Sequence, residues 1–185
     1  MIPTPLALPG VMLLEPRVHG DARGWFYEMY SETTLTGLGI DTKFVQDNRS
    51  FSAQQGTLRG LHCQAEPAAQ GKLISCTRGR ILDVAVDVRR NSPAYLQWIS
   101  VELSAENKHQ LFVPRGCLHG FITLSDNVEV FYKVDAPYSP AHDVSVRWND
   151  PAFNIDWGIA APVLSQKDVN APLWSELGLA FVMEG

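Results

Sequence analysis

The sequence predicts an all-β protein, a jelly-roll barrel or sandwich with a few short helices. Short runs of alternating apolar and polar residues recur along most of the chain, the pattern expected of half-buried strands. Turn-forming residues separate these runs roughly every 8–12 residues, a spacing typical of β-sandwiches and barrels. Two segments carry helix signals, and both are short.

The alternating runs define the expected strands. In residues 81–88, every second residue from Leu82 to Val88 is aliphatic, so these side chains share one face of a strand. Residues 97–103 and 128–134 alternate in the same way. Further β-rich runs are residues 73–77, 110–113, 121–124 and 143–148.

Turns and helix ends are marked by their usual residues. The first expected helix spans residues 32–38, with Ser31 as N-cap and Gly39 as its stop, and the second lies near residues 173–177. Turn residues separate the strands at Arg78-Gly79, Asn91-Ser92-Pro93, Pro114-Arg115-Gly116 and Ser125-Asp126-Asn127.

One local motif narrows the fold to the cupin type. Pro114-x-Gly116-x-x-His119 resembles the second half-motif of cupin jelly rolls, in which the proline and glycine turn the chain so that the histidine points into the barrel. The first half-motif normally carries H-x-H, whereas here His62 is followed by Gln64. We therefore expect a cupin-type jelly-roll β-barrel that lacks one of these histidines and holds one small ligand in its mouth.

Length and composition fit one globular domain, residues 1–185. Hydrophobic residues make up 45% of the chain and charged residues 19%, ordinary values for a soluble protein with a sizeable core. The net charge of -5 argues against a general nucleic-acid binder, which is usually basic. A few arginines can still form a local pocket for one phosphorylated ligand.

The chain shows no export or membrane signal. Residues 1–16 lack a basic n-region and prolines interrupt their apolar run, and no stretch approaches the ~20 apolar residues that span a bilayer. The three cysteines, Cys63, Cys76 and Cys117, form no C-x-x-C pair, and an odd number suits reduced thiols. We expect a cytoplasmic protein without a membrane partner.

Two histidines have surroundings that suggest chemistry. His62 lies in a strand-like segment with Arg59, although this segment alone favours a half-buried strand histidine. His119 follows an apolar turn, where a core histidine is equally compatible. A metal site needs several His, Asp, Glu or Cys ligands; Gln64 is a poor substitute, and Glu66 comes too early for the cupin spacing. We therefore predict no metal site.

The alternative is metal-free proton transfer. It needs a base, an orienting carboxylate and a group that stabilises developing negative charge. Asp168 offers a carboxylate in a polar loop, Lys72 a cation at the start of a strand, and Tyr132 a phenol on the valine face of its strand. Each is weak evidence by itself, because strand tyrosines usually pack and loop Asp–Lys pairs are usually solvated.

Arg59 and His62 can share a pocket only if their strand is irregular. Residues three apart in a regular strand face opposite sides of the sheet. A bulge between them would bring both side chains to one face, and Gly60 is the expected place for it.

Further motifs run through nearly the whole chain in a fixed order. They are Gly20-Asp21-x-Arg23-Gly24-x-Phe26-x-Glu28, Phe44-Val45-Gln46-Asp47-Asn48, Leu58-Arg59-Gly60-Leu61-His62, Gln70-Gly71-Lys72, Val101-Glu102-Leu103-Ser104-x-Glu106-Asn107, residues 114–121, Tyr132-Lys133, Arg147-Trp148-Asn149-Asp150-Pro151 and Ser165-x-Lys167-Asp168. Together they resemble the dTDP-4-dehydrorhamnose 3,5-epimerase family, a metal-independent branch of the cupin fold.

The resemblance implies an epimerase that inverts C3 and C5 of dTDP-4-dehydro-6-deoxy-D-glucose through enolate intermediates, giving dTDP-4-dehydro-L-rhamnose. His62 would be the base and Asp168 would orient its imidazole. Lys72 would stabilise the enolate oxygen at C4, and Tyr132 would deliver a proton from the opposite face. No cofactor is implied, and the chain has no G-x-G-x-x-G dinucleotide motif.

The resemblance also implies a set of substrate-binding residues. Arg59 would meet the diphosphate, His119 would line the pocket and Tyr138 would lie near the sugar. Lys167 belongs to the same set. The remaining members are Gln46 and Asn48, for polar groups of the ligand, and Arg23, Phe26 and Glu28, which would contact the nucleotide across the interface of a homodimer.

Three alternatives remain open at this point. One is an epimerase that inverts a single centre, C3 or C5, of a related nucleotide 4-keto-6-deoxy sugar in secondary metabolism. Another is a metal-dependent cupin oxygenase, which the missing ligands disfavour. The last is a non-catalytic sugar-binding cupin, against which the full set of candidate base, acid and cation argues.

Overall fold

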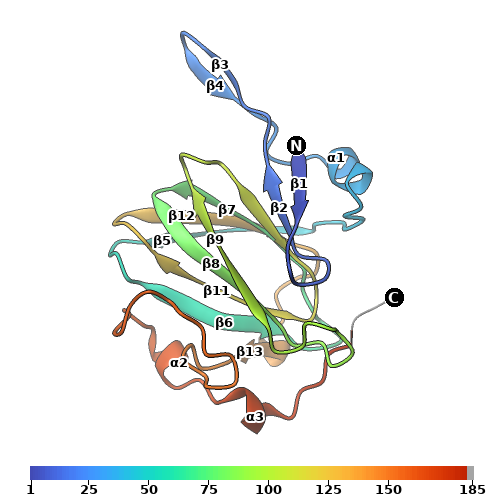
Figure 1. Ribbon diagram of the computed structural model, residues 1–185, viewed down its shortest axis with the longest axis vertical. Coiled ribbons are helices and arrows are strands. Elements are labelled where there is room, and N and C mark those ends of the chain that lie inside the picture. Colours follow the sequence, from blue (N-terminus) through green and yellow to red (C-terminus); the bar gives the residue numbers. More distant parts are fainter. Residues whose placement is uncertain (183–185) are drawn as a thin grey trace.

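Two antiparallel β-sheets make up most of the computed structural model, which describes residues 1–182 (Figure 1). The strands are β1 (Ile2–Pro5), β2 (Met12–Glu15), β3 (His19–Asp21), β4 (Gly24–Phe26), β5 (Gln46–Ser52), β6 (Leu58–Gln64), β7 (Lys72–Arg78), β8 (Arg80–Asp87), β9 (Trp98–Ser104), β10 (Gln110–Val113), β11 (Cys117–Thr123), β12 (Val128–Val134) and β13 (Asp143–Ser145). One sheet has the strand order β1-β2-β10-β7-β12-β5 and the other β13-β6-β11-β8-β9, while β3 and β4 form a separate hairpin. The predicted all-β, cupin-type jelly roll is confirmed.

The two sheets face each other across one apolar core. Ile74 of β7 and Val130 of β12 come from the six-stranded sheet, and Ala85 of β8 and Phe121 of β11 come from the five-stranded sheet. All four are buried. Side chains on the inner faces of the two sheets therefore meet, and any polar residue on an inner face points into the barrel.

Strand β8 is buried on both faces. The predicted aliphatic face, with Val84 and Val86, packs on the outside of the sheet beneath the C-terminal part of the chain, including Trp157 and Trp174. The opposite face turns Asp83 and Ala85 toward the barrel interior. The alternation correctly predicted the strand, but the face it marked is the outer one.

The helices are α1 (Glu32–Gly37), α2 (Gln166–Val169) and α3 (Trp174–Leu177). Helices α1 and α3 confirm the two predicted ones, and the Ser31 side chain accepts a hydrogen bond from the Thr34 amide as expected of an N-cap. The prediction of a polar loop at residues 165–168 is wrong, because Ser165 is the N-cap of helix α2 there. A helix of one turn is too short to show an apolar period.

The N-terminal strands escaped prediction. Strand β1 carries Pro3 and Pro5, which argue against a strand in sequence but are tolerated because β1 lies at the edge of its sheet. The β3–β4 hairpin projects from the body of the molecule (Figure 1) and exposes Trp25 and Phe26. Two predicted bounds also change, since β11 begins at Cys117 and β13 ends at Ser145.

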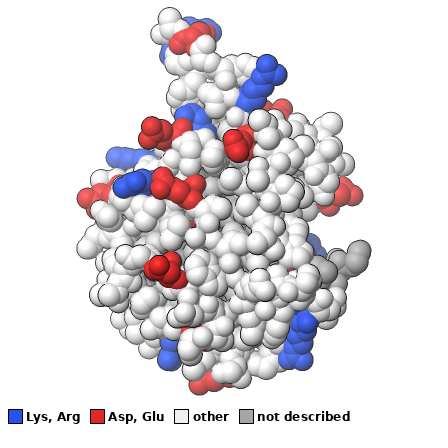
Figure 2. All heavy atoms as spheres, in the orientation of Figure 1, with Lys and Arg blue, Asp and Glu red and all other residues white. Residues whose placement is uncertain are grey.

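The surface agrees with the modest net charge. On the face shown in Figure 2, acidic and basic side chains are scattered and both signs lie close together below the projecting lobe. No helix in residues 1–182 is long and apolar enough to cross a membrane.

Candidate active site

His62 and Asp168 form a close pair although 106 positions separate them. The Nε2 atom of His62 lies 2.6 Å from Oδ1 of Asp168. The backbone brings them together, because Leu58 at the start of β6 donates its amide to the carbonyl of Val163, 2.9 Å away, and α2 follows directly. The pairing expected from the resemblance is therefore present in the geometry.

Ser165 aims the Asp168 carboxylate. Its hydroxyl accepts the Asp168 amide at 3.2 Å and donates to Oδ2 at 2.6 Å, so both carboxylate oxygens are occupied. Burial would raise the pKa of Asp168, but the hydrogen bonds from His62 and Ser165 outweigh it and hold the pKa below its usual range. Because an ionised carboxylate can only accept hydrogen bonds, the proton of the neutral His62 ring lies on Nε2, and the lone pair of Nδ1 is free.

A bulge in β6 brings Arg59 and His62 to one face, as predicted. His62 pairs with His119 and Arg59 pairs with Phe121, so β6 contains one residue more than β11 between these two pairs. Gly60, with φ of 135°, takes up the extra residue, and a Cβ there would lie only 2.6 Å from the Gly120 Cα. Arg59 and His62 consequently line one cavity of about 410 Å³.

Lys72 and Tyr132 face His62 from the other sheet. Both line that cavity and an adjoining one of about 400 Å³, and His62 and Lys167 also border both. Burial lowers the pKa of Lys72, partly offset by the negative charges of Asp83 and Asp143. Burial raises the pKa of the Tyr132 phenol. The barrel thus presents a histidine on one wall and a lysine and a protonated phenol on the other.

A second His–Asp pair lies beside the first. Nε2 of His119 is 2.7 Å from Oδ1 of Asp83, and both residues are buried. The second oxygen of Asp83 has no hydrogen-bond partner within the described residues. His119 is therefore both a core histidine and a lining residue of the cavity. Sequence reasoning missed Asp83, although an acid between the aliphatic residues Leu82 and Val84 of β8 was an available signal.

A polar cluster forms the rim of the adjoining cavity. Tyr138 donates its hydroxyl hydrogen to Oδ2 of Asp143 at 3.0 Å, and the Lys167 ammonium donates to the same oxygen at 2.6 Å. Burial would raise the pKa of Asp143, but the hydrogen bonds from Lys167 and Tyr138 hold it below its usual range. The structure thus brings the predicted Tyr138 and Lys167 to the cavity through Asp143, which the sequence did not single out.

Gln46 and Asn48 also line this cavity, but their amides are partly occupied. Gln46 donates to Oδ1 of Asn48 at 2.8 Å and accepts the Tyr138 amide at 3.1 Å. Arg59 likewise contacts its own chain, donating to the Ser52 hydroxyl at 3.2 Å. These contacts hold the predicted binding residues in place in the described structure.

Arg23, Phe26 and Glu28 lie outside the cavities that contain His62. Arg23 pairs with Asp21 at 2.6 Å on the projecting hairpin, and the Glu28 carboxylate accepts a hydrogen bond from Thr34 at 2.7 Å. Phe26 is 71% exposed, an unusual state for a large aromatic side chain. Within a single chain, the structure does not bring these three residues to the candidate site.

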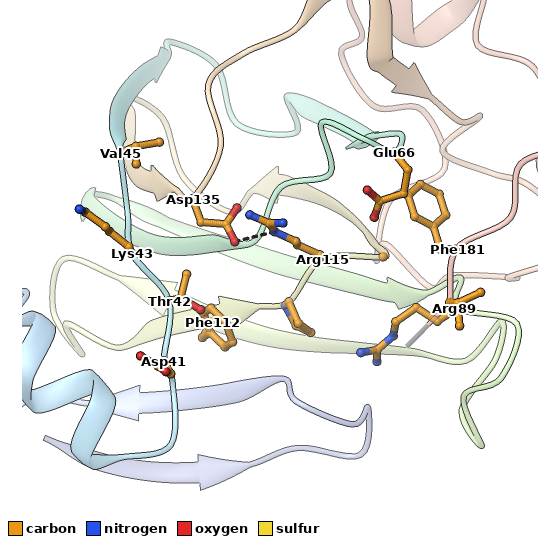
Figure 3. Close-up of a pocket in the computed structure, with 13 residues that line it drawn as sticks. Asp41, Thr42, Lys43, Val45, Glu66, Arg89, Phe112, Arg115, Asp135 and Phe181 are labelled. Carbon is orange, nitrogen blue, oxygen red and sulfur yellow. Dashed lines mark hydrogen bonds and ion pairs between the residues drawn. The ribbon is translucent and has the colours of Figure 1, made fainter. Parts of the chain in front are cut away.

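A larger cavity of about 510 Å³ lies elsewhere (Figure 3). Its lining carries Lys43 and Glu66, and Arg115 donates to Asp135 at 2.9 Å across it. It shares no lining residue with the two cavities around His62 and contains no histidine. The chemistry therefore selects the His62 cavities as the candidate site.

Metal sites and reactive thiols require particular groupings and ionisation states of side chains. Residues 1–182 contain no group of three or more His, Cys, Asp or Glu side chains arranged to hold a metal ion. Cys63 borders the smaller cavity, but burial raises the pKa of its thiol to about 12, far above that of a reactive cysteine.

Comparisons with known proteins identify the family. The family model described as dTDP-4-dehydrorhamnose 3,5-epimerase matches residues 5–176. A protein of that name from Sinorhizobium fredii is 51% identical over 177 residues, covering 95% of this chain and 91% of its own. The solved dTDP-6-deoxy-D-glucose-3,5-epimerase of Legionella pneumophila, in complex with dTDP-4-keto-L-rhamnose, superposes with a TM-score of 0.93 at 40% identity and covers 99% of both chains.

A further solved neighbour has a narrower named activity. It is a 3'-monoepimerase from Streptomyces bikiniensis in complex with dTDP-quinovose, with a TM-score of 0.88 and 35% identity, covering 96% of this chain and 92% of its own. The fold and these matches define a cupin-type isomerase of nucleotide sugars. The chain belongs to the dTDP-4-dehydrorhamnose 3,5-epimerase family.

Proposed function

We propose that this chain, acting as one domain over residues 1–185, inverts C3 and C5 of dTDP-4-dehydro-6-deoxy-D-glucose to give dTDP-4-dehydro-L-rhamnose. The observation that carries the proposal is the His62–Asp168 pair on one wall of the barrel, facing Lys72 and Tyr132 on the other. The ligand named for the Legionella pneumophila neighbour supports the substrate class. Three buried, free cysteines fit a reducing cytoplasmic setting.

The chemistry follows from the C4 ketone of the substrate. The ketone acidifies the hydrogens on C3 and C5, and Nδ1 of His62 removes one of them. Asp168 stabilises the imidazolium that forms, as a carboxylate does in hydrolase triads. Lys72 stabilises the negative oxygen of the enolate. Tyr132, kept protonated by its raised pKa, returns a proton from the opposite wall and so inverts the carbon.

The remaining lining residues hold the nucleotide sugar. Arg59 meets the diphosphate, since a guanidinium can grip phosphate oxygens through parallel hydrogen bonds. Lys167 borders the same cavity, where its ammonium is paired with Asp143 at 2.6 Å. His119 lines the cavity, and Tyr138 borders the sugar. Asn48 and Gln46 complete the polar wall on β5.

The projecting hairpin completes the site of a second copy in a homodimer. Its exposed Trp25 and Phe26 need a partner surface, and Arg23, Phe26 and Glu28 would then contact the nucleotide bound by the partner. Stacking of a base on an aromatic ring contributes about 1–3 kcal/mol in other proteins. Light scattering at assay concentration should report a dimer, whereas a fully active monomer would contradict the shared site.

Proton NMR of the substrate in D₂O tests the proposed reaction. With both centres inverted, the enzyme should replace the hydrogens at C3 and C5 by deuterium, and it should still do so after treatment with a chelator. Exchange at one carbon alone would identify a single-centre epimerase, the activity named for the Streptomyces bikiniensis neighbour. No exchange at either carbon would refute the proposal.

The Arg59→Ala variant should bind substrate more weakly while its chemical step stays close to normal. Contacts to the diphosphate are alike in the ground and transition states, so their loss mainly raises KM. Losing a charge-assisted hydrogen bond corresponds to roughly a 10–100-fold change. Steady-state kinetics check this, with Arg49→Ala as the control, because Arg49 pairs with Glu129 and borders neither His62 cavity. A collapse of kcat at unchanged KM would place Arg59 at the reacting carbons instead.

A further inference from the structure

Gln64 occupies the position where metal-binding cupins carry the second histidine of H-x-H, and its side chain has a definite task in this fold. It is 3% exposed and lies two residues after His62 on β6. Its Oε1 atom accepts the amide of Ser139 at 2.7 Å. Its Nε2 atom donates to the carbonyls of Ala68, at 2.6 Å, and Pro137, at 3.2 Å. Every hydrogen bond of this buried amide therefore goes to backbone.

These contacts join three pieces of the chain that border the substrate cavity. Strand β6 carries His62, the segment through Ala68 leads to Lys72, and the 137–139 segment carries Tyr138. The hydrogen bonds of Gln64 to residues 137 and 139 flank Tyr138 on both sides. The backbone of residues 137–139 lies outside the strands, so no neighbouring strand satisfies its hydrogen bonds. The side-chain amide of Gln64 supplies two of them.

Tyr138 is held at other points too, but these depend on the position of its backbone. Its amide donates to Gln46 at 3.1 Å, and its hydroxyl donates to Asp143, which Lys167 also contacts. Tyr138 itself is 56% exposed, so little apolar packing fixes it. Moving the 137–139 segment would therefore move the phenol and loosen the cluster at the rim of the cavity.

We propose that Gln64 is a positioning residue, which fixes Tyr138 at the substrate cavity by binding the backbone on either side of it. The inference rests on the proposed function insofar as Tyr138 contacts the nucleotide sugar. It also accounts for glutamine at this position: the task needs one acceptor and two donors in a single neutral side chain, which histidine and glutamate do not offer.

A double-mutant cycle tests whether Gln64 acts through Tyr138. Gln64→Glu keeps the acceptor for Ser139 but loses both donor bonds. It should weaken binding of dTDP-glucose, a dTDP-sugar without the C4 ketone, and raise KM by about 10–100-fold, the factor for two lost buried hydrogen bonds. At saturation, kcat should change by less than about threefold. In a Tyr138→Ala background, the same substitution should have almost no further effect on either constant.

The controls separate positioning from general stability and from the proposed function. Gln110→Glu alters another buried amide, bonded to Ser75 at 2.7 Å and outside both His62 cavities, and should leave Kd and KM unchanged. Gln64→Asn, which avoids a buried charge, replaces Gln64→Glu if that variant does not fold. Equal losses with and without Tyr138, or no loss at all, would overturn the role of Gln64. A wild-type chain that binds no dTDP-sugar would instead overturn the proposed function.

Discussion

Replacing Lys72 by methionine should lower kcat by about 10²–10³-fold, the usual cost of removing one group that stabilises a developing oxyanion. Lys72 begins β7 and borders both cavities, and no hydrogen bond or ion pair engages its ammonium among residues 1–182. An ammonium in this low-dielectric setting interacts strongly with a new negative charge. Because that charge exists only in the enolate and the transition states around it, binding of a dTDP-sugar should change far less than kcat.

Lys133→Met is the matched control for Lys72→Met. Lys133 lies on β12, pairs with Asp47 at 2.8 Å and borders neither His62 cavity. Its loss should leave kcat within about twofold, since its ion pair with Asp47 and its contact with the Tyr30 ring both lie away from the two cavities. Steady-state kinetics and calorimetry on both variants are the measurement. If Lys72→Met exchanged deuterium at the wild-type rate, the enolate would be stabilised by another group.

The pH profile offers an independent view of Lys72. Burial lowers the pKa of its ammonium, so the charge is lost at a lower pH than the ~10.4 of an ordinary lysine. Tyr132 shifts the other way and stays protonated to higher pH. The alkaline decline of wild-type kcat should therefore begin below the ordinary lysine value and should be absent from the residual activity of Lys72→Met.

The fold was predictable where strands alternate and where caps are explicit. Strands β8 and β12 and helix α1 follow from periodicity and from Ser31, because local sequence determines both features. The hairpin β3–β4 was missed because every residue of its two strands is exposed, so burial imposes no alternation on it. Helix α2 was missed because one turn is too short to display a period.

The site was only partly predictable for a different reason. His62 and Asp168 were paired through the resemblance, since nothing local connects residues 106 positions apart. Gly60 did indicate the bulge that brings Arg59 beside His62, because glycine tolerates a positive φ and close strand contact. Asp83 and Asp143 were missed, since each becomes significant only through the partner that the tertiary fold supplies.

Replacing His62 by asparagine should remove proton abstraction at both C3 and C5. Asparagine keeps a polar side chain of similar reach but has no basic nitrogen, and general base catalysis contributes about 10²–10⁴-fold, so kcat should fall by at least that factor. Only Nδ1 of His62 is available as the base, because Nε2 is bonded to Asp168 at 2.6 Å. Calorimetric binding of a dTDP-sugar should change little, since His62 is not assigned to the nucleotide.

Asp168→Asn separates the base from its orientation. The imidazole remains in this variant, so the loss in kcat should be smaller than in His62→Asn, but the carboxylate no longer stabilises the imidazolium or fixes the proton on Nε2. His109→Asn is the control, because His109 borders neither cavity and lies 4.0 Å from Glu15. Deuterium incorporation, measured separately at each carbon, distinguishes the variants. Deuterium exchange at the wild-type rate in His62→Asn would exclude His62 as the base. His119, whose own carboxylate partner Asp83 lies 2.7 Å away, would then be the next candidate.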